Sequence, residues 1–395
     1  MAFEARGRML YRQQNLKKFF VVHFSLFDVI VLIGILQGVI ASIQLFHNNR
    51  RSSDTLLAWI LVTTVLLNCK ILLHTLGLWN THLFRYFPLA VDLTIQPLLY
   101  LYVISITDSS PKLRRPALLH LLPSLFFMGH ALLVYVRVLP LDDLSKKSKI
   151  ADSLAYNAVK EMEDYLSVLS FGVYLFLSIR CLKMYRSWLY DTISDSSYPT
   201  YGWLRNLLLL MSGLTILLLA NITLDYGINY GQTSFFHWQL FYFLMTVIVY
   251  YIGFQASRQT NLPIQATVIV NKTDQTAPVS PEKLPQIRMA IDELLEKEKI
   301  YRNPTITLAE MARRLDVSPN VLSFAISKSY EKSFRDLINE YRVEEVKDKL
   351  VDGRLSHLSI LGIALDSGFN SEASFYRVFK KHTNRSPKEF QEQHR

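Results

Sequence analysis

The sequence GFNSEASFYRVFKKHTNRSPKEF, residues 368–390, decides the fold of the C-terminal third of the chain. Its apolar positions recur with the period of an α-helix over residues 371–383, and a basic cluster follows. Residues 360–366 predict a short helix before it, and Gly368 lies in the intervening turn, where glycine can adopt a positive φ angle. A helix, a tight turn and a second helix of this length are typical of a DNA-binding helix-turn-helix (HTH) unit.

The same pattern occurs earlier in the chain. Thr307 begins a short helix in TLAEMARRL, with Glu310 three residues later in the arrangement of a capping box. A turn at 316–318 follows, and Pro319 suits the first position of the next helix, residues 319–329. One such unit is a weak signal, whereas two in register are a specific one.

The stretch between the units, SFRDLINEYRVEEVKDKL (333–350), predicts one continuous helix about 27 Å long at 1.5 Å per residue. A rigid spacer of that length would hold two recognition helices about one duplex turn apart, roughly 34 Å. Residues 286–301 predict a further amphipathic helix before the first unit.

The first two thirds of the chain are apolar, and 50% of all residues are hydrophobic. A helix that crosses a bilayer needs about 20 apolar residues. Seven runs qualify, of which the fifth is the shortest: 27–46, 56–78, 88–107, 116–138, 165–182, 203–224 and 235–254. The stretch between the fourth and fifth runs, 139–164, is predicted to be a longer loop that contains both basic and acidic residues, among them Lys160. The expected fold is all-α, a seven-helix transmembrane bundle followed by a soluble domain with two HTH motifs joined by a long helix.

The expected domain boundaries follow from these patterns. Residues 1–26 form an N-terminal tail, 27–256 the bundle, 257–284 a flexible linker with at most a brief strand at 266–270, and 285–395 the DNA-binding domain. Lys and Arg in the short loops favour a cytoplasmic C-terminus and an external N-terminus, although the basic residues of the tail disagree with the latter. The net charge of +10 lies mainly outside the last domain and is not by itself a nucleic-acid signal.

Several polar side chains lie within the predicted spans. Lys70 and Asp92 are close enough in depth to form an ion pair that faces the bundle interior, where an unpaired charge would be costly. Two interpretations stay open, a set of satisfied structural residues near the interface and a sensing cavity. The residues expected at that cavity are Lys70, His74, Asp92, Gln96, Asn221 and Asp225.

The stretches LAEMARRLDVSPNVLS, FRDLINEYRVEEVKDKL and IALDSGFNSEASFYRVFKKHTNRSPKEF resemble the AraC/XylS-type transcription-factor domain. With the spans in front, the chain resembles the membrane-bound members of that family. The resemblance implies a multi-pass protein of the bacterial inner membrane whose cytoplasmic AraC-type domain binds double-stranded promoter DNA in two successive major grooves. Its expected partners are that DNA, the lipid bilayer, a second copy of the chain and an unidentified small-molecule or envelope signal.

The family's DNA-binding positions carry over residue by residue. They fall on Asn320, Ser323, Phe324, Ser327 and Lys328 in the first unit, and on Ser371, Glu372, Ser374, Tyr376, Arg377, Lys380, Lys381 and Arg385 in the second. Arg377 is the best candidate for a guanine contact, and the last three basic residues are candidates for phosphate contacts. Glu372 would accept from cytosine or only cap its helix.

Two departures from the family pattern affect the first unit more. The family often has a basic residue where Phe324 stands, and it favours glycine after each recognition helix, where this chain has Glu331 and Asn384. Asn tolerates the left-handed conformation well, whereas Glu does so poorly.

A membrane transporter or receptor with a regulatory interaction tail is the alternative function. An enzyme is not expected, because the sequence has no Gly-rich phosphate loop, no HExxH and no GxSxG. No cofactor is expected, and Cys69 and Cys181 lack metal-ligand spacing, so no metal is expected either.

Overall fold

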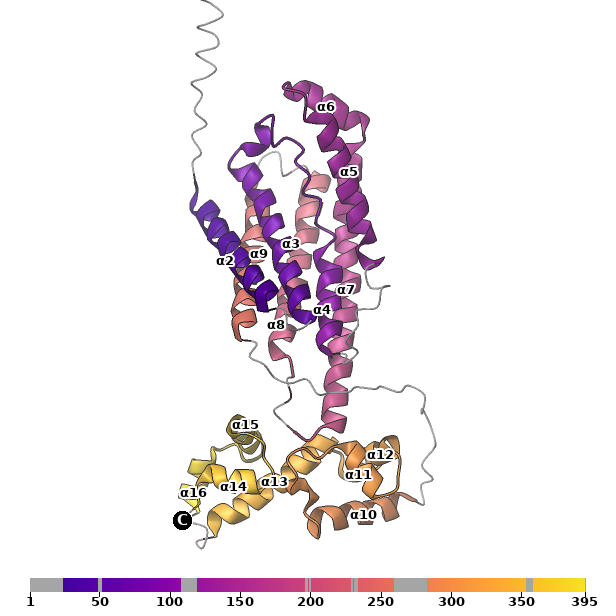
Figure 1. The fold of residues 1–395 in the computed structure, drawn as a ribbon, viewed down its shortest axis with the longest axis vertical. Coiled ribbons are helices and arrows are strands. Elements are labelled where there is room, and N and C mark those ends of the chain that lie inside the picture. Colours follow the sequence, from indigo (N-terminus) through magenta and orange to yellow (C-terminus); the bar gives the residue numbers. More distant parts are fainter. Residues whose placement is uncertain are drawn as a thin grey trace, which may run out of the picture. The chain divides into compact units, whose positions relative to one another are not determined.

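The computed structural model describes residues 24–48, 52–107, 119–195, 198, 200–228, 230, 234–258, 283–352 and 358–394. These residues fold into helices, so the all-α prediction is confirmed (Figure 1). They form two compact units. One holds the residues up to Ile179 and those from Trp203 to the end of the last apolar helix, and the other holds Arg180–Gly202 with the C-terminal residues. The predicted strand at 266–270 lies outside the described residues.

The first unit contains the apolar helices. They are α2 (Leu26–Asn48), α3 (Ser52–Thr75), α4 (Ile95–Thr107), α5 (Leu122–Val138), α7 (Tyr156–Thr192, which continues into the second unit), α8 (Gly202–Ile222) and α9 (Phe236–Arg258). Six of the described helices are long and apolar enough to cross a membrane, and α4 is a shorter apolar helix. Each of the seven predicted runs therefore corresponds to a helix, with corrections in the third and fifth.

The third run is helical only from Ile95, seven residues later than predicted. The chain from Pro88 to Thr94 is irregular, and Pro97 lies in the first turn of α4, where its missing N–H costs no intrahelical hydrogen bond. Irregular backbone within a membrane bundle is tolerated where it is buried in protein or lines a cavity.

The fifth run lies in the longest helix of the described chain, not in the shortest. The 37 residues of α7 begin at Tyr156, inside the stretch predicted as a loop. Another helix of that predicted loop is α6 (Leu144–Ser153), capped by Asp143, whose side chain accepts a hydrogen bond from the backbone of Ser145. The loop prediction for 139–164 is therefore wrong, because hydropathy alone does not detect a helix that continues with charged residues.

Glycines allow close contact between α2 and its two neighbours, α3 and α9. A Cβ atom on Gly34 would overlap the side chain of Thr246, and one on Gly38 would lie 2.6 Å from Val65 Cγ2. Small residues spaced by one helical turn let helix backbones approach closely, which favours packing within a membrane.

The C-terminal part of the second unit is built on α13. Its helices are α10 (Leu284–Glu296), α11 (Leu308–Arg314), α12 (Pro319–Tyr330), α13 (Phe334–Val351), α14 (Ile360–Asp366), α15 (Glu372–Thr383) and α16 (Pro387–Gln393). The predicted helix 286–301 ends early, at Glu296. Lys299 has a φ angle of 50° and begins a separate 3-10 turn, η6 (Ile300–Arg302).

Two hydrophobic cores share α13. Phe334, Leu337 and Ile338 at its N-terminal end pack into a core with α10, α11 and α12. Val343, Val346 and Leu350 at its other end pack into a second core with α14, α15 and α16. The predicted spacer is thus one continuous helix that belongs to both cores.

Candidate DNA-binding domain and bundle cavity

The first HTH unit is fixed by side-chain caps at both helix starts. Thr307 Oγ1 accepts a hydrogen bond from the backbone of Glu310 at 3.2 Å, and Ser318 Oγ accepts one from Val321 at 3.3 Å. Asp316, in the turn between α11 and α12, has a φ angle of 54°. The predicted helix, turn and helix are confirmed, with α12 one residue longer than expected.

The second HTH unit repeats this construction. Ser359 caps α14 and Ser371 caps α15, each accepting from the backbone three residues later. Gly368 has a φ angle of 93°, in the region that side chains rarely adopt. A Cβ at this position would also collide with the carbonyl oxygen of Tyr301 and lie 2.8 Å from Arg302 Cα. Only glycine fits this turn, which packs directly on η6.

Most of the predicted DNA-binding side chains are at least partly exposed. On α12 these are Asn320, Ser323, Phe324, Ser327 and Lys328, and at the second unit they are Glu372, Tyr376, Arg377, Lys380, Lys381 and Arg385. The expected exposure of Ser374 is wrong, because this side chain is 4% exposed. Ser371 is half-buried and serves as the cap of α15, and Lys381 pairs with Asp336 on α13 at 2.9 Å.

The ends of both second helices adopt the left-handed conformation. Glu331 after α12 has a φ angle of 55°, and Asn384 after α15 has 58°. Glu331 therefore adopts the left-handed conformation, which is unfavourable for glutamate. As a result, α12 ends at the same relative position as α15.

Buried polar contacts join η6 to α13. Arg342 is 1% exposed, and its guanidinium donates to the carbonyl oxygens of Tyr301 at 2.7 Å and Asn303 at 2.8 Å. Glu345 accepts from Tyr301 Oη at 2.5 Å and pairs with Arg302 at 2.7 Å. Burial raises the pKa of Glu345, but the hydrogen bonds from Arg302, Lys349 and Tyr301 outweigh this and lower it to about 2. This carboxylate is therefore charged at neutral pH.

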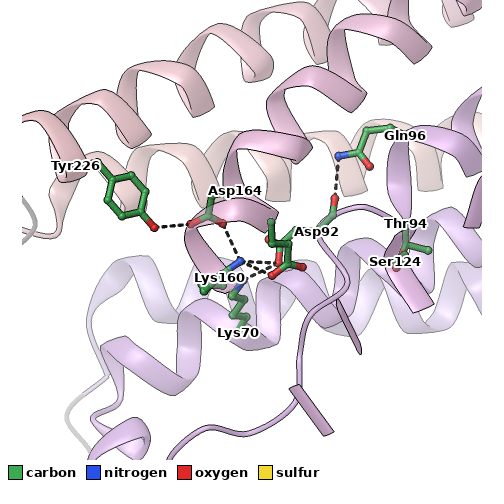
Figure 2. Close-up of polar contacts among 9 residues, drawn as sticks. Lys70, Asp92, Thr94, Gln96, Ser124, Lys160, Asp164 and Tyr226 are labelled. Carbon is green, nitrogen blue, oxygen red and sulfur yellow. Dashed lines mark hydrogen bonds and ion pairs between the residues drawn. The ribbon is translucent and has the colours of Figure 1, made fainter. Parts of the chain in front are cut away.

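Within the first unit, the predicted ion pair is present. Lys70 Nζ on α3 lies 2.8 Å from Asp92 Oδ2, in the irregular segment before α4 (Figure 2). Gln96 is 2% exposed and donates to the backbone carbonyl of Asp92 at 2.8 Å. The irregular backbone thus has hydrogen-bonded support from the first turn of α4.

The sequence reasoning missed the α7 side of this cluster. Lys160 Nζ lies 3.3 Å from Asp92, 2.8 Å from Glu163 and 2.7 Å from Asp164, as Figure 2 shows in part. We call Lys70, Asp92, Lys160, Glu163 and Asp164 the charged cluster. Lys160 was predicted to lie in a loop, although its spacing from Glu163 and Asp164 places all three on one face of a helix.

Two cavities of about 200 Å³ and 220 Å³ adjoin the charged cluster. Lys70, His74 and Lys160 line both. The first has apolar and aromatic walls that include Trp238, and the second is lined by Glu163, whose Oε1 atom is buried without a hydrogen-bond partner. An apolar pocket with a few convergent polar groups is a typical ligand site.

The other predicted cavity residues bond elsewhere. Asn221 is fully buried and donates to the carbonyl oxygen of His237 at 3.2 Å. Asp225 pairs with His237 at 2.8 Å and accepts from Trp238 Nε1 at 2.6 Å. Neither Asn221 nor Asp225 lines the two cavities. The structure therefore brings Lys70, His74 and Asp92 together at the first cavity, with Gln96 hydrogen-bonded to the backbone of Asp92, and places Asn221 and Asp225 in a separate set of contacts around His237.

Comparison with known proteins places the C-terminal region in a family. A family model described as a helix-turn-helix domain matches residues 311–393. An uncharacterized HTH-type transcriptional regulator of Staphylococcus aureus (strain MSSA476) is 28% identical over 100 residues, which cover 25% of this chain and 13% of that protein. The HTH-type transcriptional regulator YijO of Escherichia coli (strain K12) is 31% identical over 120 residues, 30% of this chain and 39% of that protein.

The chain thus matches well under half of the length of these relatives, and no solved structure matches it. The matched residues begin within α11 and end at the last residue of α16, so they contain both recognition helices and the spacer. Residues 311–393 are an AraC-type helix-turn-helix domain, as the sequence resemblance implied.

Proposed function

We propose that the chain is a transcription regulator held in the bacterial inner membrane, with its AraC-type domain in the cytoplasm. The observation that carries this proposal is the pair of HTH units whose two cores share one helix, α13, in a chain whose described residues also include six helices long and apolar enough to cross a membrane. A membrane-bound domain pairs more readily with a second copy, because anchoring raises its effective concentration, and we include a homodimer in the proposal.

Base recognition would come from the exposed faces of α12 and α15. Phe324 is 44% exposed, which suits contact with thymine methyl groups, and Arg377 suits the edge of guanine. Lys380 and Arg385 suit phosphate contacts, which orient the domain without specifying sequence. Ser374 is excluded from this surface by its burial.

The test is promoter binding by the full chain in lipid nanodiscs. The duplex would be the one most enriched when the protein is immunoprecipitated from cells. Arg377→Ala should weaken binding by about 1–3 kcal/mol and relax one base preference. The matched control is Arg288→Ala on α10, where the arginine is exposed and outside both recognition helices. Equal binding by Arg377→Ala and the parent would refute the assignment of α15.

We propose further that the cavities beside the charged cluster bind the signal. Their apolar walls suit the body of an amphiphilic molecule, and the charged cluster suits its polar head. Asp92→Asn should abolish the response of a reporter gene to the signal while leaving membrane abundance unchanged. The control is Asp142→Asn, an exposed carboxylate before α6. An unchanged response in Asp92→Asn would remove the sensing role.

Transport is the second candidate function, favoured by two interruptions of helical backbone in the bundle. One is the irregular segment before α4, and the other is the π-helical turn Thr223–Gly227 after α8. Interrupted helices often form the substrate sites of transporters. Concentration of a labelled solute by vesicles containing the protein would support this alternative.

A further inference from the structure

Residues 193–195, which follow α7, pack within the unit that contains the HTH domain. We call them the docking segment. Ile193 forms an isolated antiparallel bridge with Thr307, the cap of α11. Ser194 is fully buried, and its Oγ donates to the carbonyl oxygen of Ile306 at 2.6 Å. A piece of chain far from the C-terminal domain in sequence thus closes the start of the first HTH unit.

Two buried arginines of α13 hold the docking segment from the other side. Arg335 donates to the carbonyl oxygens of Ile193 at 2.8 Å and Asp195 at 2.9 Å. Arg342 contacts both the carbonyl oxygen and the hydroxyl of Ser194, at 3.5 and 3.4 Å. The two arginines are 4% and 1% exposed. A buried charge without hydrogen-bond acceptors is energetically costly. Because the docking segment supplies acceptors, it lowers the free-energy cost of burying the two guanidinium groups.

The docking segment also contacts the second HTH unit. Asp195 Oδ2 accepts a hydrogen bond from Asn370 Nδ2 at 3.0 Å. Asn370 directly precedes Ser371, the cap of α15. In HTH proteins the N-terminal residues of the recognition helix contact base edges. Three consecutive residues therefore contact the start of α11, the spacer α13 and the DNA-facing end of α15.

The helix α7 carries three residues of the charged cluster and leads directly into the docking segment. Lys160, Glu163 and Asp164 lie in the first three turns of α7, and the docking segment begins directly after its last residue, Thr192. At 1.5 Å per residue, 37 residues span about 55 Å, well beyond the roughly 30 Å of a hydrocarbon core. A shift or rotation of α7 would therefore act directly on the docking segment, which contacts both HTH units.

We propose that residues 193–195 are positioning residues for DNA binding, which fix the two HTH units relative to each other and transmit the state of α7 to them. This inference rests on the proposed function. When the segment is docked, both recognition helices are held for simultaneous entry into two successive major grooves. When α7 withdraws it, Arg335 and Arg342 lose acceptors, Asn370 loses its partner, and affinity for the double site falls.

The test is a double-mutant cycle on the full chain in nanodiscs. The variants are Asp195→Ala, Asn370→Ala and the double variant. The control is Asp191→Ala, whose carboxylate accepts from Ser187 within α7. The probes are the immunoprecipitated promoter duplex and a scrambled duplex of the same composition. Each single variant should bind the promoter about tenfold more weakly than the parent, because each loses one charge-assisted hydrogen bond. The double variant should bind as well as the single variant with the lower affinity, because both substitutions remove the same hydrogen bond.

Binding to the scrambled duplex and binding by the control should stay at the parent's level. Additive losses in the double variant, or equal losses on the scrambled duplex, would overturn the positioning role. A parent that does not distinguish the promoter from the scrambled duplex would instead refute the proposed function. Hydrogen exchange in α10 and α12 should match the parent in every variant, and faster exchange there would mean that the segment only stabilises the fold.

Discussion

Replacing Gly368 with alanine tests whether the turn of the second HTH unit packs on η6 as described. The backbone at this position has a φ angle of 93°, which would cost alanine about 1–2 kcal/mol. The new Cβ would also collide with Tyr301 O and lie 2.8 Å from Arg302 Cα, and overpacking of this kind costs about 1–3 kcal/mol. We expect a total loss of about 3 kcal/mol.

Hydrogen exchange measured on the full chain in nanodiscs reports this loss locally. Amides of α14 and α15 should exchange about 100-fold faster, since each 1.4 kcal/mol is a factor of ten. The matched control is Gly362→Ala in α14, where a new Cβ would make a tight contact of 3.2 Å with one side-chain atom, Ser359 Oγ, and would meet no backbone atom of η6, so exchange should change far less than in Gly368→Ala. Equal exchange in Gly368→Ala and Gly362→Ala would refute the close approach of the turn to η6.

The remaining predictions concern the pKa of Glu345 and the packing of α2. The pKa of Glu345 is depressed from 4.5 to about 2, so its stabilising contribution is complete above pH 4.5 and is lost as the pH falls from about 4.5 to about 2. The free energy of opening of α13, measured by hydrogen exchange, should fall between pH 4.5 and about pH 2 in the parent and stay constant in Glu345→Gln. The same pH dependence in both proteins would contradict the lowered pKa of Glu345. Gly34→Leu should destabilise the bundle by about 1–3 kcal/mol and lower its thermal aggregation temperature in detergent. The control is Gly213→Leu, which has open space around it, and an equal effect of both would mean that α2 does not pack closely on α9.

The elements that the sequence predicted well are those with local signals. The cap Thr307 lies one residue before a helix whose period is visible, and Gly368 marks the turn that needs a positive φ angle. The pair of Lys70 and Asp92 was also predictable, because buried charges need partners and few were within reach.

The parts that the sequence did not reveal depend on context. Hydropathy placed the start of the fifth span at residue 165, so Lys160 and Glu163 were assigned to a loop although their helix continues through them. The docking segment is held in part through the backbone carbonyl oxygens of Ile193 and Asp195, which no side-chain pattern marks, and the apolar periodicity of the spacer does not identify their partner Arg335 as buried. Ser374 was expected on the exposed face because its burial depends on packing against the second core.

Both cores pack on one uninterrupted helix. The number of residues in α13 therefore sets the rotation of one HTH unit relative to the other about the axis of this helix. Adding a single residue between Ile338 and Val343 would turn the second core by about 100° and advance it by 1.5 Å. The second recognition helix would then point away from the groove that its twin faces. Substitutions of exposed side chains on α12 and α15 leave this rotation unchanged, whereas an insertion or a deletion within α13 alters it.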